Sequence, residues 1–426
     1  MMSLYNVIPL ILCLLLSTAL KAEPPKLLTL QLAIDSALQD NPNLAQMQAR
    51  SKAMAAVPFQ VGSLPDPVIS FNALNLPVDS FNLAQDNMTQ MRAGISQAIP
   101  FFGKLELRTQ VASYHAEAAS YDVTEQRFRL LRDVKNTWWT LFYLHRALEI
   151  VSLNQSLLRQ FVDIARTKYE VGEGLQQDVL LAQLELSKLL DRKIMLQGAL
   201  KKSQAQLNYL LSNPANQALF LPEKVSEELR SIKNEQSLFA EANHTRALLS
   251  SQRNSIYAAQ SQLKLAEKSL MPDFNVGVFY GGRVDNLSGQ ERSDLMSFKV
   301  SMNVPLFAAS KQQKEIDQRN SELMQQRYAL QDQWNQVQAD ISSAHSDFQQ
   351  SQQQAILFKQ GIIPQAKQTV ASMLAGYQVN KVDFLNLVRS QITLYNYEIQ
   401  YWQAFVKVKQ AAAKLISMVG KEEIYE

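Results

Sequence analysis

The sequence predicts a mainly α-helical fold with a small β part, in which two pairs of strands interrupt very long helices. Three observations favour this fold class. Long stretches of the 426-residue chain contain neither proline nor glycine, two segments alternate apolar and polar residues, and the two halves of the chain resemble each other. The resemblance between the halves strengthens the other two observations, because the same order of elements is expected in each half.

The long helices are predicted from stretches that lack proline and glycine, the residues that most often interrupt helices. Three such stretches run from Lys104 to Val171, from Ala308 to Gln360 and from Tyr377 to Val419. An unbroken helix over the first stretch would be about 100 Å long at about 1.5 Å per residue. Globular helices have only about 11 residues on average. We therefore expect long, coiled-coil-like helices and not one compact domain.

Strands are predicted where apolar and polar residues alternate with a period of two. The first pair covers about 67–76 and 89–99, and the second covers about 273–283 and 294–304. Each segment approaches the roughly 9 to 11 residues with which a tilted strand crosses a bilayer, and each has one apolar and one polar face. The alternative is two ordinary hairpins packed on a soluble core, which this alternation does not exclude.

An internal repeat relates the two halves of the chain. Tyr169 and Val171 recur 208 positions later as Tyr377 and Val379, and LPD before the first strand pair is matched by MPD before the second. The predicted organisation is a signal peptide (1–22), a first repeat (23–212), a connecting segment (213–222), a second repeat (223–420) and a C-terminal tail (421–426).

The first 22 residues predict a secretory signal, because an apolar run of about a dozen residues ends in small residues. The alternative, a single membrane anchor, requires roughly 20 apolar residues. The only cysteine, Cys13, lies within this segment, so the exported chain would carry no thiol. A disulfide, a thiolate metal site and a cysteine nucleophile are therefore not expected.

The composition argues against several classes of function. A net charge of +3 with 19% charged residues gives no electrostatic footprint for a nucleic-acid partner. No phosphate-binding loop or catalytic motif is visible, so neither an enzyme nor a cofactor is expected. The histidines lack metal-ligand spacing, and most of the candidate soft-metal methionines lie on the apolar stripe of the strands, which favours packing against lipid. These residues are His115, His145, His244 and His345, and Met88, Met91, Met296 and Met302.

Four strands in one chain are too few for a closed membrane sheet. A lipid-exposed sheet must close, because each unpaired backbone group in hydrocarbon costs several kcal/mol. The smallest bacterial barrels have about eight strands. We therefore expect the chain to share a barrel with copies of itself, and this geometry alone leaves a dimer, a trimer and a tetramer open.

The sequence resembles the TolC family of outer-membrane efflux proteins from about Leu28 to Val419. The resemblance rests on LPDPVISF with Asn75 and Pro77, on SQAIPFFGKLELR, on the strand pairs and on the duplication. The PDP and Pro-Phe-x-Gly-Lys pieces are most similar to the heavy-metal branch typified by CzcC and CusC. The resemblance implies a homotrimer in which twelve strands form one outer-membrane barrel, continued by an α-helical barrel in the periplasm.

The resemblance also implies that the two helix-to-helix turns form a periplasmic tip, which meets an adaptor and constricts the closed pore. The first turn gives Tyr169, Gly172 and Asp178, and the second gives Tyr377, Asn380, Asp383, Asn386 and Arg389. Two departures stand out: Asn380 replaces a glycine that the family favours, and Asn386 with Arg389 replace pore-lining aspartates, so that Asp383 would have to supply acidity there. For Asp178, the alternative role is favourable electrostatics at a helix start.

The expected function is therefore a passive duct in the outer membrane of a Gram-negative bacterium, with a large periplasmic portion. The resemblance implies three partners besides the other copies of the chain: outer-membrane lipid, a periplasmic adaptor protein and an inner-membrane RND pump. Heavy-metal cations are the expected substrate. The alternatives are a drug or small-molecule channel of the same family and a soluble periplasmic coiled-coil scaffold.

Overall fold

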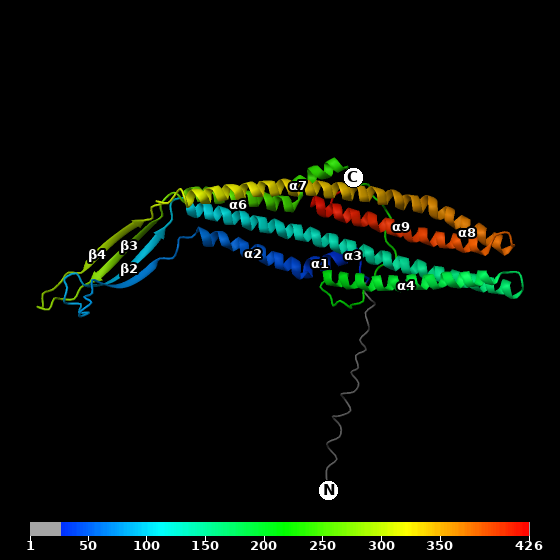
Figure 1. Ribbon diagram of the computed structural model, residues 1–426, viewed down its shortest axis with the longest axis horizontal. Coiled ribbons are helices and arrows are strands. Elements are labelled where there is room, and N and C mark those ends of the chain that lie inside the picture. Colours follow the sequence, from blue (N-terminus) through cyan, green and yellow to red (C-terminus); the bar gives the residue numbers. More distant parts are fainter. Residues whose placement is uncertain (1–26, 426) are drawn as a thin grey trace, which may run out of the picture.

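The computed structural model describes residues 27–425, and the predicted signal peptide (1–22) lies outside them. The molecule is elongated, with a four-stranded sheet at one end and two helix-to-helix turns at the other (Figure 1). The strands are β1 (Val68–Leu74), β2 (Gln90–Ile99), β3 (Phe274–Gly282) and β4 (Leu295–Met302). Each strand lies inside the range in which residues alternate with a period of two. The predicted fold class, mainly helical with a small sheet, is confirmed.

The helices are α1 (Leu30–Asp40), α2 (Pro42–Gly62), α3 (Lys104–Glu170), α4 (Gln176–Leu210), α5 (Glu235–Thr245), α6 (Ala247–Lys268), α7 (Gln312–Leu357), α8 (Ile363–Gln378) and α9 (Phe384–Val419). The three stretches that lack proline and glycine contain the helices α3, α7 and α9, whereas other helices include such residues, among them Pro58 in α2 and Gly198 in α4. The longest, α3, has 67 residues. A π-helix (Phe358–Ile362) joins α7 to α8 beside Pro364, whose missing N–H interrupts the α-helical hydrogen-bond ladder.

The sheet is antiparallel throughout, with strand order β1-β2-β3-β4. Its central pairing joins the two repeats, because Gly94 of β2 lies opposite Phe279 of β3. The face that carries the apolar stripe is open to the outside: the side chains of Phe71 and Phe298 are 80% and 77% exposed. This exposure contradicts the alternative of hairpins packed on a soluble core.

The strands and the helices are joined by a lysine and an aspartate from different repeats. The Nζ of Lys104, in the first turn of α3, donates to the Oδ1 of Asp273 at 2.8 Å, and the Phe101 backbone N–H donates to the same oxygen at 2.8 Å. Partial burial alone would raise the pKa of Asp273, but these two donors hold it below its ordinary value. The MPD and Pro-Phe-x-Gly-Lys pieces of the sequence therefore meet at one junction.

Buried aromatic rings hold the first long helix against the last. Trp138, Trp139 and Phe142 of α3 pack with Trp402 and Phe405 of α9, and the ring centroids of contacting pairs lie 4.9–5.9 Å apart. Aromatic side chains contribute a large apolar area to a core. Within residues 27–425, no helix combines the length and the apolar character that a bilayer span needs.

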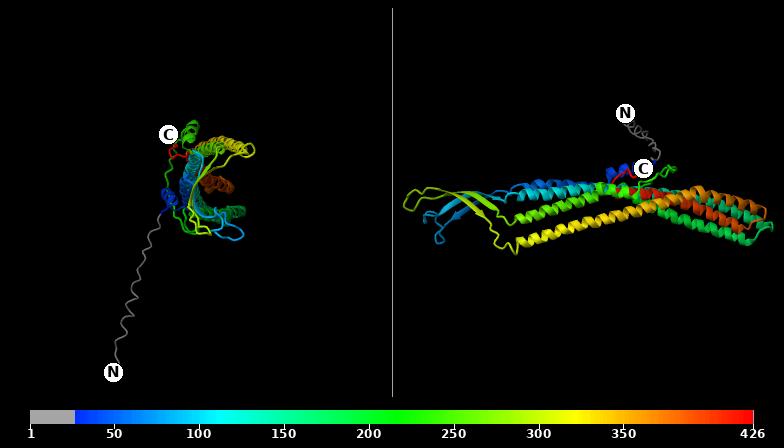
Figure 2. Two further views of the ribbon diagram at one scale, coloured as in Figure 1. Left: turned by 90° about the vertical axis from the view of Figure 1, so that its left-hand side faces the viewer. Right: turned by 90° about the horizontal axis from the view of Figure 1, so that it is seen from above.

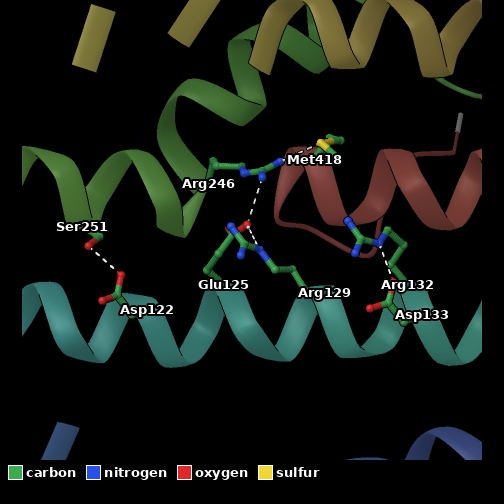
Figure 3. A network of polar contacts seen from close by, with 8 residues as sticks. All are labelled: Asp122, Glu125, Arg129, Arg132, Asp133, Arg246, Ser251 and Met418. Carbon is green, nitrogen blue, oxygen red and sulfur yellow. Dashed lines mark hydrogen bonds and ion pairs between the residues drawn. The ribbon is translucent and has the colours of Figure 1, made fainter. Parts of the chain in front are cut away.

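A buried ion pair joins the junction of α5 and α6 to α3 (Figure 3). Arg246 donates through Nη2 to the Oε1 of Glu125 at 3.0 Å, and the two side chains are only 5% and 7% exposed. Arg129 donates to the same oxygen at 3.1 Å. The other guanidinium end lies 3.1 Å from the sulfur of Met418 in α9. Three helical segments that are far apart in the sequence thus meet at Arg246.

Replacing Glu125 by alanine is expected to lower the free energy of unfolding by about 3–5 kcal/mol, because it leaves a buried guanidinium without its partner. The double replacement of Glu125 by leucine and Arg246 by methionine should recover most of this loss, since no buried charge then remains. Urea denaturation in detergent, followed by circular dichroism, measures both.

The matched control for this experiment is Glu117→Ala, which removes an exposed glutamate from the same helix. This control should change stability by no more than about 0.5 kcal/mol. Equal denaturation curves for Glu125→Ala and Glu117→Ala would show that the ion pair does not contribute to stability.

Candidate functional site

The turn between α3 and α4 and the turn between α8 and α9 lie together at the end of the molecule opposite the sheet (Figure 1). We call these two turns, residues 171–175 and 379–383, the paired turns. Their proximity brings together residues 208 positions apart in the sequence. A chemical link between them is made by Lys168, in the last turn of α3.

The backbone of the two turns is nearly the same. Gly172 and Asn380 both have positive φ, +80° and +58°. The Gly172 N–H donates to the Tyr169 carbonyl at 3.0 Å, and the Asn380 N–H donates to the Tyr377 carbonyl at 3.2 Å. Asparagine is one of the few residues besides glycine that adopts the left-handed conformation readily. The turn is therefore preserved although Asn380 replaces the glycine that the family favours. The same turn separates α8 from α9, so the third stretch without proline or glycine, Tyr377 to Val419, is not one continuous helix.

Lys168 binds the second turn through three contacts. Its ammonium group donates to the Tyr377 carbonyl at 3.1 Å and to the side-chain oxygen of Asn380. It also lies 4.5 Å from the centroid of the Tyr377 ring, within the range of a cation–π interaction. Lys168 belongs to this cluster, although the sequence did not indicate it. The asparagine side chain thus supplies an acceptor that a glycine could not.

The order of larger and smaller residues is reversed between the two turns. Lys168 and Gly174 in the first turn correspond to Gly376 and Val382 in the second. A Cβ on Gly174 would lie 2.9 Å from the Cβ of Lys168, and a Cβ on Gly376 would lie 2.5 Å from a methyl carbon of Val382. Each turn therefore combines one larger residue with one glycine, in opposite order.

The two repeated tyrosines have different environments. Tyr377 is 6% exposed, whereas Tyr169 is 47% exposed. The Tyr377 ring packs against Phe384, with centroids 5.2 Å apart. Burial and the neighbouring charge of Asp178 raise the pKa of the Tyr377 hydroxyl. The sequence repeat therefore does not produce two equivalent sites.

Acidic groups from both turns lie close enough to influence each other. Asp178 is the acidic residue of the first turn of α4. Its pKa is raised by burial and by the negative charge of Asp383, against the effect of a hydrogen bond from the Leu175 backbone. Asp383 is the N-cap residue of α9, although its side chain makes no capping hydrogen bond. Asp178 therefore lies at a helix start, as its alternative role requires, and it also has a carboxylate neighbour from the other turn.

Three of the predicted residues are not part of this cluster. Tyr169, Asn386 and Arg389 are exposed. Within residues 27–425, no carboxylate oxygen lies within 4.0 Å of the Arg389 side chain. The structure thus brings together Asp178, Tyr377, Asn380 and Asp383, while Gly172 shapes the first turn. The roles of all eight residues in gating and in adaptor contact stay predictions.

Between residues 27 and 425, no three His, Cys, Asp or Glu side chains are placed so that they could hold a metal ion. The methionines Met91, Met296 and Met302 are exposed and share the apolar face of the sheet. Their position fits contact with lipid better than metal coordination.

The model of the family described as "Outer membrane efflux protein" matches residues 33–213 and 238–421, which is most of the chain. The chain belongs to the outer membrane efflux protein family. It is an outer-membrane efflux channel, as the resemblance implied, and the alternative of a soluble periplasmic scaffold is wrong. The relatives are efflux channels and not enzymes.

Individual relatives are distant in sequence and similar in fold. The outer membrane efflux protein BepC of Brucella suis biovar 1 is 23% identical over 353 residues, which cover 79% of this chain and 74% of BepC. The structure of VceC from Vibrio cholerae has a TM-score of 0.78 at 17% identity, covering 92% of this chain and 97% of VceC. The structure of CusC has a TM-score of 0.77 at 16% identity, covering 92% of both chains. The structural comparisons support the fold alone.

Replacing Lys168 by glutamine should loosen the second turn, because the charge-assisted contacts to Tyr377 and Asn380 are lost. Spin labels on cysteines introduced at Glu173 and Lys381 would report the distance between the turns by pulsed electron paramagnetic resonance. A broader distance distribution is expected in the Lys168→Gln protein.

The control is Arg166→Gln, which removes an exposed cation from the same helical turn whose ion pair with Glu170 stays within α3. It should leave the distribution unchanged. If Lys168→Gln and Arg166→Gln gave the same distribution as the parent protein, Lys168 would not hold the turns together.

Proposed function

We propose that this channel is a homotrimeric duct of a tripartite efflux system, powered by an inner-membrane RND pump through a periplasmic adaptor. The observation that carries the proposal is the four-stranded sheet, whose apolar face is exposed and whose outer strands β1 and β4 each have one strand partner within the chain. In lipid, the free backbone groups of β1 and β4 need partners. Pairing β4 of one copy with β1 of the next supplies them, and three copies give twelve strands.

The shape of the protomer supports a tube that is closed by several copies. Seen from the strand end, the helices and strands follow an open curve (Figure 2). Apolar side chains at helical spacing on α4 are exposed, among them Leu180, Leu184 and Ile194. Burying such a stripe against a neighbouring copy stabilises an assembly. The repeats 23–212 and 223–420 would each provide one strand pair and one helix-to-helix turn per copy.

The paired turns are the proposed site of adaptor contact and pore constriction. They are the parts of the helical region farthest from the sheet, so they face the periplasm when the strands lie in the outer membrane. Within them, Lys168 and Asn380 hold one turn against the other. The exposed residues Tyr169, Asn386 and Arg389 remain available for a partner.

Heavy-metal cations are the proposed substrate, on the resemblance of the PDP and Pro-Phe-x-Gly-Lys pieces to the heavy-metal branch. Drugs or other small toxic compounds are the second candidate, because one of the two sequence pieces behind the metal assignment has a structural role. The lysine of the second piece, Lys104, binds Asp273 at the junction of strand and helix. This structural role needs no metal, so the piece is a weak guide to the substrate.

The purified protein should be a trimer in detergent and should give stepwise ion conductance in planar bilayers. Val300→Arg should impair assembly in the membrane, because a lipid-facing arginine costs free energy in every copy, about 2–4 kcal/mol at the bilayer midplane and less toward its edges. Light scattering and single-channel recording measure the two properties.

The matched control is Ser301→Arg, which places the same side chain on the polar face one residue further along β4. It should assemble and conduct. A monomeric, non-conducting parent protein would contradict the proposed function, and equal behaviour of the two arginine variants would contradict the assignment of the faces.

Deleting the gene should lower the tolerance of the host to heavy-metal salts, because the exit route would be lost. Growth inhibition by zinc or cobalt salts, compared with inhibition by drugs, measures this effect. Expression of the parent gene should restore tolerance, and expression of Val300→Arg should restore less of it. Unchanged metal tolerance together with lower drug tolerance would support the second candidate substrate.

A further inference from the structure

The four strands contain only two charged residues, Arg92 in β2 and Lys299 in β4, and both are basic. The register places them on the same face. Gly94 pairs with Phe279, and Ser96 and Lys299 both pair with Gly277. Since alternate residues of a strand share a face, Arg92, Gly94 and Ser96 lie on the same side of the sheet as Lys299. This is the polar side, opposite the exposed apolar stripe.

Neither positive charge is neutralised by a neighbouring acid. In the part of the chain that the structure describes, no carboxylate oxygen lies within 4.0 Å of Arg92 or Lys299. The Nε of Arg92 is buried without a hydrogen-bond acceptor. Next to the strands, Asp273 is paired with Lys104, and Asp294 accepts hydrogen bonds from the Tyr280 hydroxyl and the Arg283 backbone. The other acids of the flanking segments lie outside the strands, so the strands themselves carry positive charge only; these acids are Asp66, Asp79, Asp86, Asp285 and Glu291.

A single aromatic ring holds the arginine in place. The guanidinium carbon of Arg92 lies 3.9 Å from the centroid of the Phe279 ring, a favourable cation–π distance. The ring lies close over one glycine of the neighbouring strand β2 and one glycine of its own strand, β3. A Cβ on Gly94 would lie 2.1 Å from the ring, and one on Gly277 would lie 2.8 Å from it. The glycines therefore make room for Phe279, which in turn supports the cation without neutralising it.

We infer that the barrel section of the duct is electropositive and prefers anionic solutes to cationic ones. This inference rests on the proposed trimer, in which the polar faces line the lumen and three copies contribute six positive charges. Charged walls concentrate counter-ions within about a Debye length, which is ~10 Å at 0.1 M salt. A bare divalent cation is disfavoured in this section, so a metal ion passes it more easily as a complex with anionic ligands.

The test is the reversal potential of the channel in a planar bilayer that separates two KCl concentrations. In dilute KCl, the parent protein should show chloride preference, and raising the salt to 1 M should weaken it, because the Debye length falls to about 3 Å. The double replacement of Arg92 and Lys299 by glutamine should shift the reversal potential toward potassium. Arg92→Lys keeps the charge and should preserve the parent value.

The matched control is Lys224→Gln, which removes an exposed cation of the segment between α4 and α5, outside the strands. It should leave the reversal potential unchanged. The inference is overturned if the double variant conducts with the parent reversal potential, while the proposed function then stands. If the double variant does not insert, Arg92→Gln alone is measured. Its reversal potential should shift in the same direction, by a smaller amount. Absence of conductance in every protein, including the parent, contradicts the proposed function instead.

Discussion

Backbone pairing between the two repeats is the constraint on which the rest of this structure depends. The β2–β3 register joins the first strand pair to the second and makes one sheet of four strands. At its base, the contact of Lys104 with Asp273 fixes the start of α3 to the start of β3. The long helices can therefore leave the sheet in a defined direction, and their far ends meet as the paired turns.

Most of the fold was predictable because it depends on local sequence pattern. Helices without proline or glycine and strands with a period of two leave clear signals, and the repeat located the turn at Asn380 even though no glycine or proline marks it. Contacts between distant segments leave no such signal. The pairing of Gly94 with Phe279 and the ion pair of Arg246 with Glu125 both join residues more than a hundred positions apart, and no pattern along the chain indicates either.

The candidate site was predictable only where the two repeats agree. Comparing the repeats directs attention to matching residues such as Tyr169 and Tyr377, and these have unequal environments in the folded chain. Lys168 was missed because its counterpart is a glycine, so the comparison treats the position as variable. Its contacts with Tyr377 and Asn380 arise from the difference between the repeats. The proximity of Asp178 and Asp383 likewise depends on how the turns pack.

The opposite order of glycine and larger residue in the paired turns limits which substitutions each turn accepts. A change of Gly376 alone meets Val382, and a change of Gly174 alone meets Lys168. Within one turn, the glycine can therefore gain a side chain only if its larger neighbour loses one. The two turns reach nearly the same backbone by opposite choices at these positions, so a similar backbone does not require a similar order of residues there.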